Sequence, residues 1–410
     1  MKKILFVINT LGCAGAEVAL MALLGSLDPQ KYDVSLFVLM NQGEMVNRIP
    51  KNVHFLNKEY SDCPIHSEEG KKQLKKHVLK TSLKNGSGIR NIPYVLTNLA
   101  RMKKKGEIWP EKLLWKMMAD GAPRVFENYD MAVAYIEGGA AYYVANYVNA
   151  DRKVGFIHID YGKAGYTRKL DKKCYNEFEK IFTVSEEVKN SFLKVYPEYA
   201  GKTEIFHNII DQEGIRKKAE EEGGFIDNFD GIRLLTVGRL TTQKAYEVAI
   251  DAMKLLKEKD VGKVRWYVVG EGELRPKLQE QIDKNGLTED FLLIGARENP
   301  YPYYAQTDIY VHATRFEGKS IAIQEAQTLG CCLLVSDCSG NREQVIDGVD
   351  GQMCELTPEG ISEALAELIQ NPEKRKEYQQ MAKKKEIDSR KEVEKLLVLL
   401  EEKKEFFKKK

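Results

Sequence analysis

Short apolar runs recur along this 410-residue chain, and polar segments of helical length separate them. The runs in the first half predict these strands: Ile4–Ile8, Val34–Leu39, Val53–Leu56, Met131–Tyr135, Lys153–Ile157, Ile181–Val184 and Glu204–Phe206. The runs in the second half predict these: Arg233–Val237, Arg265–Val269, Phe291–Ile294, Ile309–Ala313 and Cys332–Ser336. Apolar strands that alternate with amphipathic helices are typical of parallel sheets. The pattern therefore predicts an α/β protein.

A polar, acid-rich stretch interrupts this pattern between residues 211 and 231. Such a stretch is typical of a boundary between domains, and the chain is long enough for two domains with separate cores. We therefore expect an N-terminal domain over residues 1–210 and a C-terminal domain over residues 211–375. The remaining residues, 376–410, are rich in lysine and glutamate and predict a helical tail.

Composition narrows the class of protein. The formal net charge is +2, so the overall charge does not indicate a nucleic-acid partner. Seven cysteines, without a Cys-x2-Cys spacing, do not suggest a disulfide framework or a metal site, and Cys331-Cys332 lie in an apolar run that predicts buried thiols. The first apolar run, Ile4–Ile8, stops at Asn9 without a cleavage site, and no run is long enough to cross a membrane. These features favour a cytoplasmic protein.

Two glutamates, Glu317 and Glu325, stand eight positions apart, after a predicted strand and at the start of a predicted helix. Carboxylates accept hydrogen bonds in pairs, which suits the vicinal hydroxyls of a sugar or a ribose. Backbone amides from Gly318 to Ile321, at the start of the helix, could bind a phosphate. A solvated pair of charges is the alternative.

Two cations, Arg239 and Lys244, follow the predicted strand that ends at Val237. Open parallel sheets bind ligands beyond the carboxyl ends of their strands. Arginine supplies a planar fork for phosphate and lysine a compact point charge. Two ordinary surface cations are the alternative.

Arg239 and Lys244, followed by Glu317-x7-Glu325, resemble the donor site of the family 4 retaining glycosyltransferases, which have the GT-B fold. Gly270-Glu271-Gly272 and Asn299-Pro300 fit the same resemblance, which runs from the first strand to about residue 370 and is densest from 231 to 356. It is closest to bacterial enzymes that build capsular, exopolysaccharide or other envelope glycans. It implies two Rossmann-like, doubly wound domains that face each other across a cleft, with the C-terminal helices crossing back to the first domain.

The resemblance also implies roles for these residues. Glu325 would hold the ribose and Glu317 the transferred sugar, while Arg239 and Lys244 would neutralise the leaving diphosphate. Gly318, Lys319 and Ser320 would lie against the diphosphate or the sugar, Gly270 would belong to the donor site, and Arg297 would lie beside the nucleotide base.

The donor is expected to be a nucleotide sugar, a UDP-sugar in preference to a GDP-sugar. The sequence contains no Asp-x-Asp motif, so we expect a reaction that is independent of metal. The nucleotide sugar is a substrate, and no cofactor is expected.

The first loop of the chain contains Gly12 and Gly15. Glycines let the backbone approach a phosphate, and a helix that follows adds a favourable dipole. A plain tight turn is the alternative. The loop resembles the glycine-rich loop of the family, although Cys13-Ala14 replaces the common double glycine.

Polar residues also follow other predicted strands of the first half. His158 matches the histidine that lies beside the transferred sugar in the family, and a structural histidine is the alternative. Asp160, Tyr161 and Glu137 are candidates for contacts with the acceptor, and Asn208 resembles a turn at the hinge.

A basic helical insertion over about residues 66–120 completes the first half. Thirteen Lys or Arg and two acids lie between Gly70 and Met118, and apolar residues recur among them at helical spacing. A basic, amphipathic insertion predicts docking on an anionic membrane surface, in keeping with a lipid-linked or glycan acceptor. A helix that packs on the core with a solvated basic face is the alternative.

The sequence as a whole predicts a retaining, metal-independent glycosyltransferase of bacterial envelope polysaccharide synthesis, cytoplasmic or peripheral on the inner face of the membrane. Two other functions share the fold. A nucleotide-sugar epimerase would act on the donor without an acceptor, and a non-catalytic partner subunit would bind a glycosyltransferase or a glycan. The complete set of donor-site residues argues against both.

Overall fold

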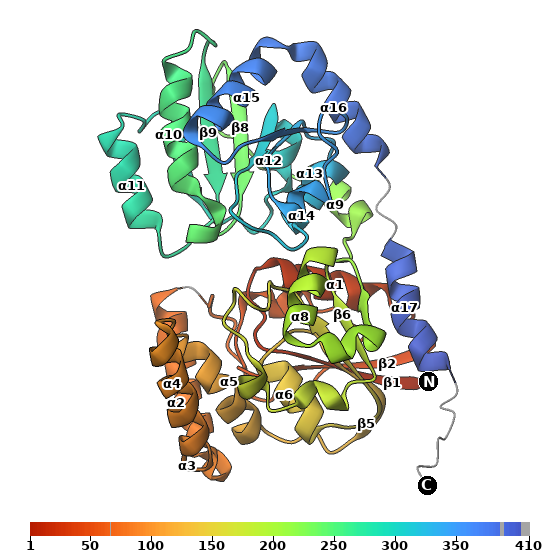
Figure 1. The fold of residues 1–410 in the computed structure, drawn as a ribbon. Helices are drawn as coiled ribbons and strands as arrows, with labels where there is room; N and C mark the ends of the chain where they lie inside the picture. The colour runs from red at the N-terminus through yellow and green to blue at the C-terminus, as the bar shows by residue number, and fades with distance from the viewer. Residues whose placement is uncertain (66, 386–388, 403–410) are drawn as a thin grey trace. The chain divides into compact units, whose positions relative to one another are not determined.

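The computed structural model describes residues 1–65, 67–385 and 389–402, which form two compact units, each built on one parallel sheet (Figure 1). The first unit runs from Met1 to Ile209 and also contains helix α17 (Ser389–Glu401). The second unit begins at Ile210 and includes helix α16 (Pro372–Lys384). The predicted α/β class with two doubly wound sheets is confirmed.

Seven parallel strands form the sheet of the first unit, in the order β3-β2-β1-β4-β5-β6-β7. The strands are β1 (Lys2–Ile8), β2 (Tyr32–Val38), β3 (Val53–Phe55), β4 (Asn128–Ala134), β5 (Asn149–Ile157), β6 (Lys180–Thr183) and β7 (Thr203–Ile205). The chain winds outward from β1 to β3 and then returns to pair β4 with the other edge of β1. This reversal between β1 and β4 is the switch point at which doubly wound sheets bind ligands.

Helices cover both faces of this sheet. They are α1 (Gly15–Ser26), α6 (Gly139–Tyr147), α7 (Arg168–Asp171) and α8 (Glu186–Val195), with the insertion helices α2 (Glu68–Leu83), α3 (Ser87–Arg90), α4 (Ile92–Lys105) and α5 (Pro110–Gly121). Side chains of β1 alternate between two cores: Leu5 and Val7 face one, and Ile4 and Phe6 the other. A strand that is apolar on both faces reads as a continuous apolar run, as β1 does.

Helix α17 packs into the second of these cores although it lies far along the chain. Val393, Leu396 and Leu400 share one helical face and are buried there. The carboxylate of Glu392 accepts the amide hydrogen of His207 at 3.0 Å. The C-terminal helix therefore belongs to the first unit, as the resemblance implies.

Six parallel strands form the second sheet, in the order β10-β9-β8-β11-β12-β13. The strands are β8 (Ile232–Val237), β9 (Val264–Val269), β10 (Phe291–Gly295), β11 (Ile309–His312), β12 (Leu333–Ser336) and β13 (Gln352–Cys354). The switch point of this sheet lies between β8 and β11. The helices are α9 (Gln212–Ala219), α10 (Tyr246–Lys257), α11 (Arg275–Lys284), α12 (Tyr301–Gln306), α13 (Ile321–Thr328), α14 (Ser339–Arg342), α15 (Pro358–Gln370) and α16.

The strand prediction is confirmed for all twelve runs, and β13 is the strand that it lacks. Cys331 and Cys332 are buried, as expected, just before β12. All seven cysteines are free thiols. Among the described residues no helix combines the length and the apolar character needed to cross a membrane.

Candidate active site

The carboxyl ends of β8 and β11 meet at the switch point of the second sheet. Short loops leave both strands, and each carries residues that the sequence singles out. The loop after β8 contains Arg239 and a 3-10 turn, η5 (Thr242–Lys244), and the loop after β11 contains Glu317. Parallel strands bring these loops to the same edge of the sheet, which is why residues more than seventy positions apart come together.

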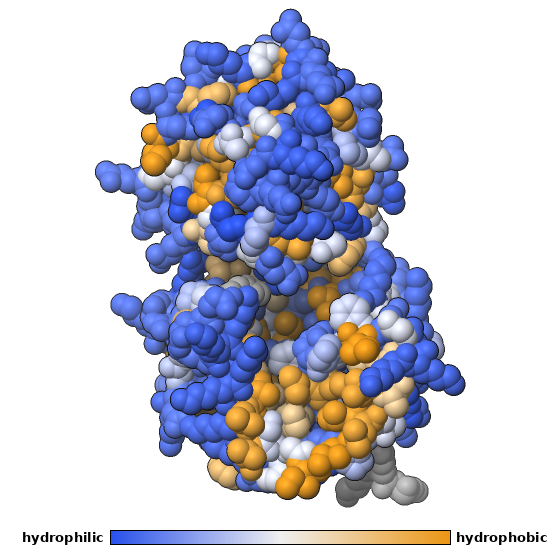
Figure 2. All heavy atoms as spheres, turned by 90° about the vertical axis from the view of Figure 1, so that its left-hand side faces the viewer, coloured by the Kyte–Doolittle hydropathy of each residue, from blue (hydrophilic) through white to orange (hydrophobic). Residues whose placement is uncertain are grey.

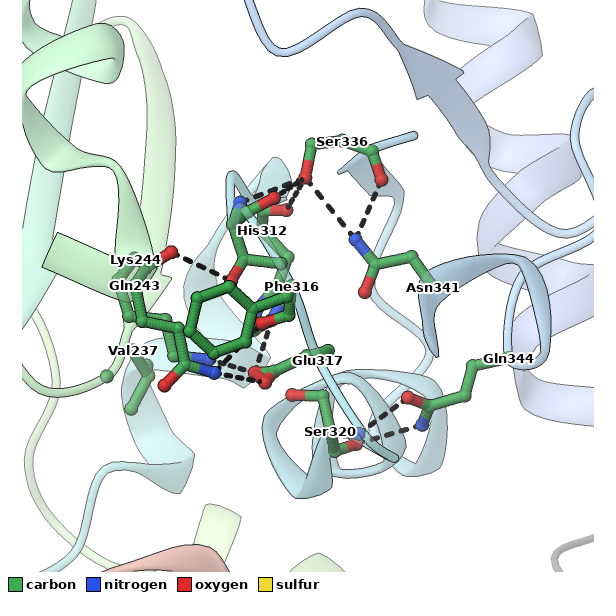
Figure 3. A network of polar contacts seen from close by, with 12 residues as sticks. Val237, Gln243, Lys244, His312, Phe316, Glu317, Ser320, Ser336, Asn341 and Gln344 are labelled. Carbon is green, nitrogen blue, oxygen red and sulfur yellow. Dashed lines mark hydrogen bonds and ion pairs between the residues drawn. The ribbon is translucent and has the colours of Figure 1, made fainter. Parts of the chain in front are cut away.

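Glu317 is the centre of a buried polar network at this edge (Figure 3). Lys244 forms an ion pair with its Oε1, Gln243 donates to its Oε2 at 2.9 Å, and Nε2 of His312 lies 3.3 Å from Oε1. The side chains of Lys244 and Glu317 are only 14% and 10% exposed. Both charges are therefore largely removed from water, and each depends on the other.

Electrostatics in this network keep the carboxylate ionised. Burial alone would raise the pKa of Glu317, but the charge of Lys244 and the hydrogen bond with His312 lower it to about 2. Burial and the Lys244 charge lower the pKa of His312 to about 4. At neutral pH the cluster thus contains one anion and a neutral imidazole.

Arg239 precedes Lys244 by five positions on the loop after β8 and is not part of this network. Its side chain is exposed on the loop after β8, so it is accessible to an anionic ligand. The loop itself is held by close backbone packing against the loop after β9. A Cβ atom on Gly270 would lie 1.9 Å from the carbonyl oxygen of Gly238. Gly270 is therefore required for the shape of the site, not for a side-chain contact.

Glu325 lies on α13 and is buried. The hydroxyl of Tyr301 donates to its Oε1 at 3.0 Å, and that of Tyr304 donates to its Oε2 at 3.1 Å. Both tyrosines come from α12. Two tyrosine hydroxyls thus donate hydrogen bonds to Glu325 within the protein. They are the same kind of donor as the ribose hydroxyls that Glu325 is predicted to bind.

The loop that joins Glu317 to α13 is tightly packed. The amide of Ser320 donates to Oε1 of Gln344 at 2.6 Å, and its carbonyl accepts from Nε2 of the same side chain at 2.9 Å (Figure 3). A Cβ atom on Gly340 would lie 2.4 Å from the carbonyl oxygen of Glu317. Of the amides predicted to meet a phosphate, that of Ser320 is thus engaged with Gln344, and the prediction stays open for Gly318, Lys319 and Ile321.

Arg297 lies on the loop after β10, next to the predicted base pocket. Its side chain is exposed, and its Nε donates to the hydroxyl of Tyr303 at 3.1 Å. Gly295, at the end of β10, has a φ of +83°, which a residue with a side chain adopts with strain. The backbone at this position therefore follows a path that favours glycine.

The switch point of the first sheet also collects polar residues, and Asn9 links its two strands. Its Nδ2 donates to the carbonyl of Glu137 at 3.1 Å, and its Oδ1 accepts from the amide of Ala140 at 2.8 Å. The buried carboxylate of Glu137 accepts the amide hydrogen of His158 at 3.0 Å. Burial raises the pKa of Glu137, and the His158 amide and the charge of Lys112 oppose that change.

His158 is positioned by this carboxylate and by aromatic neighbours. Its ring lies 5.0 Å from that of Tyr135 and 6.1 Å from that of Phe156, measured between centroids. Its Nε2 is buried and has no hydrogen-bond partner among the described residues. Burial lowers the pKa of His158 to about 4. The imidazole is therefore neutral near pH 7, with one nitrogen left for a ligand.

The loop after β1 places Gly12 beside Ile65, and Gly15 begins α1. The neighbouring amide of Cys13 donates to Oε1 of Glu44 at 3.1 Å. A carboxylate therefore already occupies part of the region in which a phosphate was predicted. The roles of Gly12 and Gly15 toward a donor stay predictions.

Asp160 and Tyr161 have structural partners. Ser191 donates to the carboxylate of Asp160, which also accepts the amide hydrogen of Lys163 at 3.1 Å. Tyr161 is fully buried, and its hydroxyl donates to Oδ2 of Asp171 at 2.8 Å. The hydroxyl of Tyr161 is thus engaged inside the core, and the expected contact of this residue with an acceptor stays a prediction.

Several residues of these sites were not identified from the sequence. They are His312, Gln243, Gln344, Tyr301, Tyr304, Asn9 and Lys112. His312 ends β11 at the switch point, and this position was the available signal for it. The others come from elements distant in sequence. In the part of the chain that the structure describes, no cluster of His, Cys, Asp and Glu has the arrangement of a metal site.

Comparison with known protein families identifies residues 225–385 as a match to the family described as "Glycosyl transferases group 1". This range contains β8 to β13 and hence the whole Lys244–Glu317 network.

Two similar proteins act on lipid-linked substrates by their names. The N-acetylgalactosamine-N,N'-diacetylbacillosaminyl-diphospho-undecaprenol 4-alpha-N-acetylgalactosaminyltransferase of Campylobacter jejuni is 27% identical over 392 residues, which cover 93% of this chain and 94% of that protein. The UDP-Gal:alpha-D-GlcNAc-diphosphoundecaprenol alpha-1,3-galactosyltransferase of Escherichia coli is 34% identical over 123 residues, or 29% of this chain and 32% of that protein.

Solved structures share the fold over nearly the whole chain. HepE of Anabaena, in complex with UDP and glucose, has a TM-score of 0.65 at 17% identity and covers 98% of this chain and 99% of its own. The solved structure "Trehalose-6-phosphate from E. coli bound with UDP-2-fluoro glucose" also has a TM-score of 0.65, at 12% identity, over 97% of this chain and 99% of its own. At these identities the likeness shows the fold, with two parallel sheets as in GT-B glycosyltransferases.

Proposed function

Because residues 225–385 form a glycosyl transferases group 1 domain, we propose that this chain is a retaining, metal-independent glycosyltransferase of family 4. It transfers a sugar from a UDP-sugar to a lipid-linked glycan acceptor in the synthesis of a bacterial envelope polysaccharide. The observation that carries the proposal is the buried Lys244–Glu317 pair beside the exposed Arg239, at the switch point within that domain.

The names of the relatives support the substrates. The Escherichia coli enzyme is named for a UDP-sugar donor, and HepE was solved with UDP. Both named enzymes modify glycans on a diphosphoundecaprenol carrier. A UDP-sugar and a polyprenyl-diphosphate glycan are therefore the donor and the acceptor that we propose for this chain.

The donor-side residues act on the bond between the anomeric carbon and the diphosphate oxygen. As this bond breaks, negative charge grows on the departing diphosphate, and Arg239 and Lys244 stabilise it. A preorganised donor of this kind is typically worth about 3 kcal/mol in the transition state. Glu325 accepts hydrogen bonds from the ribose hydroxyls, in exchange for one or both of those from Tyr301 and Tyr304.

The state of Glu317 favours front-face attack over a covalent intermediate. Its oxygens are engaged with Lys244, Gln243 and His312, and its pKa is lowered to about 2, so it is a weak nucleophile. It orients the sugar by accepting a hydroxyl hydrogen. The acceptor hydroxyl then bonds to the anomeric carbon on the face that the diphosphate leaves, and a diphosphate oxygen takes its proton. The configuration of the sugar is thereby retained.

His158 supports the acceptor side of the reaction. With a pKa lowered to about 4, its ring is neutral at pH 7 and does not supply a proton as an imidazolium. Its unpartnered Nε2 can hydrogen-bond a sugar hydroxyl, and Glu137 fixes the backbone that carries it. His158 therefore orients the substrate and does not act as a general acid.

The test uses the purified chain and a panel of UDP- and GDP-sugars. Thermal shift identifies the donor, and transfer to a polyprenyl-diphosphate glycan is then followed with and without EDTA. We expect one UDP-sugar to serve as donor, EDTA to have no effect, and proton NMR to show the donor's anomeric configuration in the product. Epimerised donor without an acceptor, or an inverted linkage, would contradict the proposal.

A further inference from the structure

Exposed apolar side chains concentrate on the helical insertion of the first unit. Of the fourteen large hydrophobic side chains that are exposed among the described residues, six belong to residues 79–108. Five of them form a group that we call the apolar tip: Leu79, Leu83, Ile89, Ile92 and Leu96. Figure 2 views the side on which α2, α3 and α4 lie in Figure 1 and shows hydrophobic side chains gathered on the first unit.

The apolar tip lies where the chain passes from α2 through α3 into α4. Leu79 and Leu83 are four positions apart in the last turns of α2, and Ile92 and Leu96 are four apart in the first turns of α4. Residues four apart share one face of a helix. Ile89, on α3, completes the group and is 77% exposed. The tip is thus a turn region that presents apolar side chains from three consecutive helices.

The packing of α4 explains why these side chains are not core residues. Tyr94, Asn98 and Met102 are buried on its other face, and the hydroxyl of Tyr94 donates to the carbonyl of Leu170 at 3.0 Å. The helix therefore already has an inner face that packs on the unit. Ile92 and Leu96 face outward from it. One face of α4 thus packs on the unit, and docking of the insertion on a membrane stays a prediction.

The outward faces of α2 and α4 also carry lysines, which lie farther along each helix from the apolar tip. On α2, Lys72 and Lys76 precede Leu79 and Leu83 at spacings of three and four residues and are exposed. On α4, exposed Lys103 and Lys104 follow Leu96 by seven and eight residues, or two helical turns. Thirteen basic and two acidic residues lie between Gly70 and Met118. Acids outside this range pair with Lys71, Lys80 and Lys116, and the insertion still keeps an excess of positive charge.

We propose that the apolar tip inserts into the interface of a membrane while the lysines around it bind anionic lipid headgroups. Apolar side chains leave water at the level of the acyl chains, and each lysine near an anionic surface adds attraction. A protein partner of comparable apolar area would need no surrounding excess of one charge, so this charge pattern favours a lipid surface. The inference concerns where the chain docks and does not depend on sugar transfer.

The test is co-sedimentation of the full chain with vesicles, in the absence of any nucleotide sugar. The test variant is Leu83→Ser/Ile89→Ser/Leu96→Ser, and the matched control is Ile226→Ser/Ile346→Ser/Val349→Ser, which removes three exposed side chains elsewhere. Because all six side chains are exposed, both variants should keep the wild-type circular dichroism and melting temperature.

We expect the wild type and the control to bind vesicles that contain about one-third phosphatidylglycerol, and to bind pure phosphatidylcholine at least about tenfold more weakly. The test variant should lose at least about tenfold in its partition coefficient, since three apolar side chains no longer leave water. Transfer to a short, water-soluble acceptor should be equal in all three proteins, so a failure of the proposed reaction would be seen separately.

Three outcomes would overturn the inference. One is a wild type that does not bind anionic vesicles, and another is a test variant that binds them as tightly as the wild type. The third is a wild-type dimer that the test variant converts to a monomer in sedimentation velocity, with no vesicle binding, which would show the apolar tip to be an interface between copies of the chain.

Discussion

Replacing Lys244 by methionine should expose how strongly the second unit depends on the buried pair. The substitution keeps the length of the side chain and removes its charge, so Glu317 is left as a carboxylate that is 10% exposed and has lost its counter-ion. The lowering of its pKa from 4.5 to about 2 corresponds to roughly 3 kcal/mol of favourable interaction. Unpaired buried charges typically destabilise by about 3–5 kcal/mol. We expect Lys244→Met to lower the free energy of unfolding by about 2–4 kcal/mol at pH 7.

A double-mutant cycle isolates the pair. Glu317→Gln alone leaves the ammonium unpaired, whereas Lys244→Met/Glu317→Gln removes both charges, so the double variant should be more stable than the sum of the single effects predicts, by about 2 kcal/mol. The matched control is the pair of Lys257 and Asp290, whose lysine side chain is 47% exposed. The coupling energy between Lys257 and Asp290 should stay below about 1 kcal/mol.

The pH dependence has a definite sign. In the wild type the folded pKa of Glu317 is lowered, so its stabilisation is complete above the ordinary value of 4.5 and is lost as the pH falls toward 2. In Lys244→Met the effect of burial remains and raises the pKa, so this variant loses stability as the pH rises through the ordinary value. The difference between the two proteins should therefore be small near pH 3 and largest near pH 7.

Urea unfolding followed by tryptophan fluorescence measures these differences. Trp266 is buried in the second core, and the other two tryptophans, Trp109 and Trp115, lie in the first unit. Changing those two to phenylalanine in every protein of the cycle makes the signal specific for the second unit. A coupling energy below about 0.5 kcal/mol, or a destabilisation that is equal at pH 4 and pH 7, would refute the reasoning.

Three further predictions concern other positions. Gly270→Ala would place a methyl group against a backbone carbonyl 1.9 Å away. We therefore expect a thermal-shift assay to show weaker donor binding and a lower melting temperature. A variant with unchanged binding and melting temperature would show that the loop is not rigid. Tyr301→Phe removes a donor to the buried Glu325, which should destabilise by about 1.5–3 kcal/mol in urea unfolding; no change would mean that the carboxylate finds another donor. Burial raises the pKa of Asp171 to about 6, so the wild type should lose stability as the pH rises from 4 to 6. Asp171→Asn should gain about 2–3 kcal/mol relative to the wild type as the pH rises over that range; parallel stability curves would contradict this.

The sequence predicted the architecture well because the strands of parallel sheets are buried on both faces. Such strands form continuous apolar runs, and all twelve predicted runs are strands. The strand β13 was not predicted because Gln352–Cys354 has only three residues at an edge and no apolar run. The same runs placed Arg239, Lys244 and Glu317 just after strand ends. The order of the strands in each sheet, which defines the switch points, was not predicted.

The details of the site could not be predicted because they depend on contacts between distant segments. The tyrosine donors to Glu325 come from α12, more than twenty positions before it. The engagement of Ser320 by Gln344 depends on how α14 packs on the loop. The burial of Tyr161 is set by Asp171 and its tyrosine neighbours, which no local pattern reveals. The positions of the strands along the chain were thus predictable, and the side-chain partners were not.

The central claim is that the second unit holds a nucleotide sugar, with Glu325 on the ribose. It is tested most directly by calorimetric titration of UDP and of 2′,3′-dideoxy-UDP into the wild type and into Glu325→Gln. The account predicts that the wild type binds UDP at least about tenfold more tightly than the dideoxy compound, and that the variant binds both with similar, weaker affinity. A wild type that binds the two compounds equally, or a variant that keeps the full preference for UDP, would contradict it.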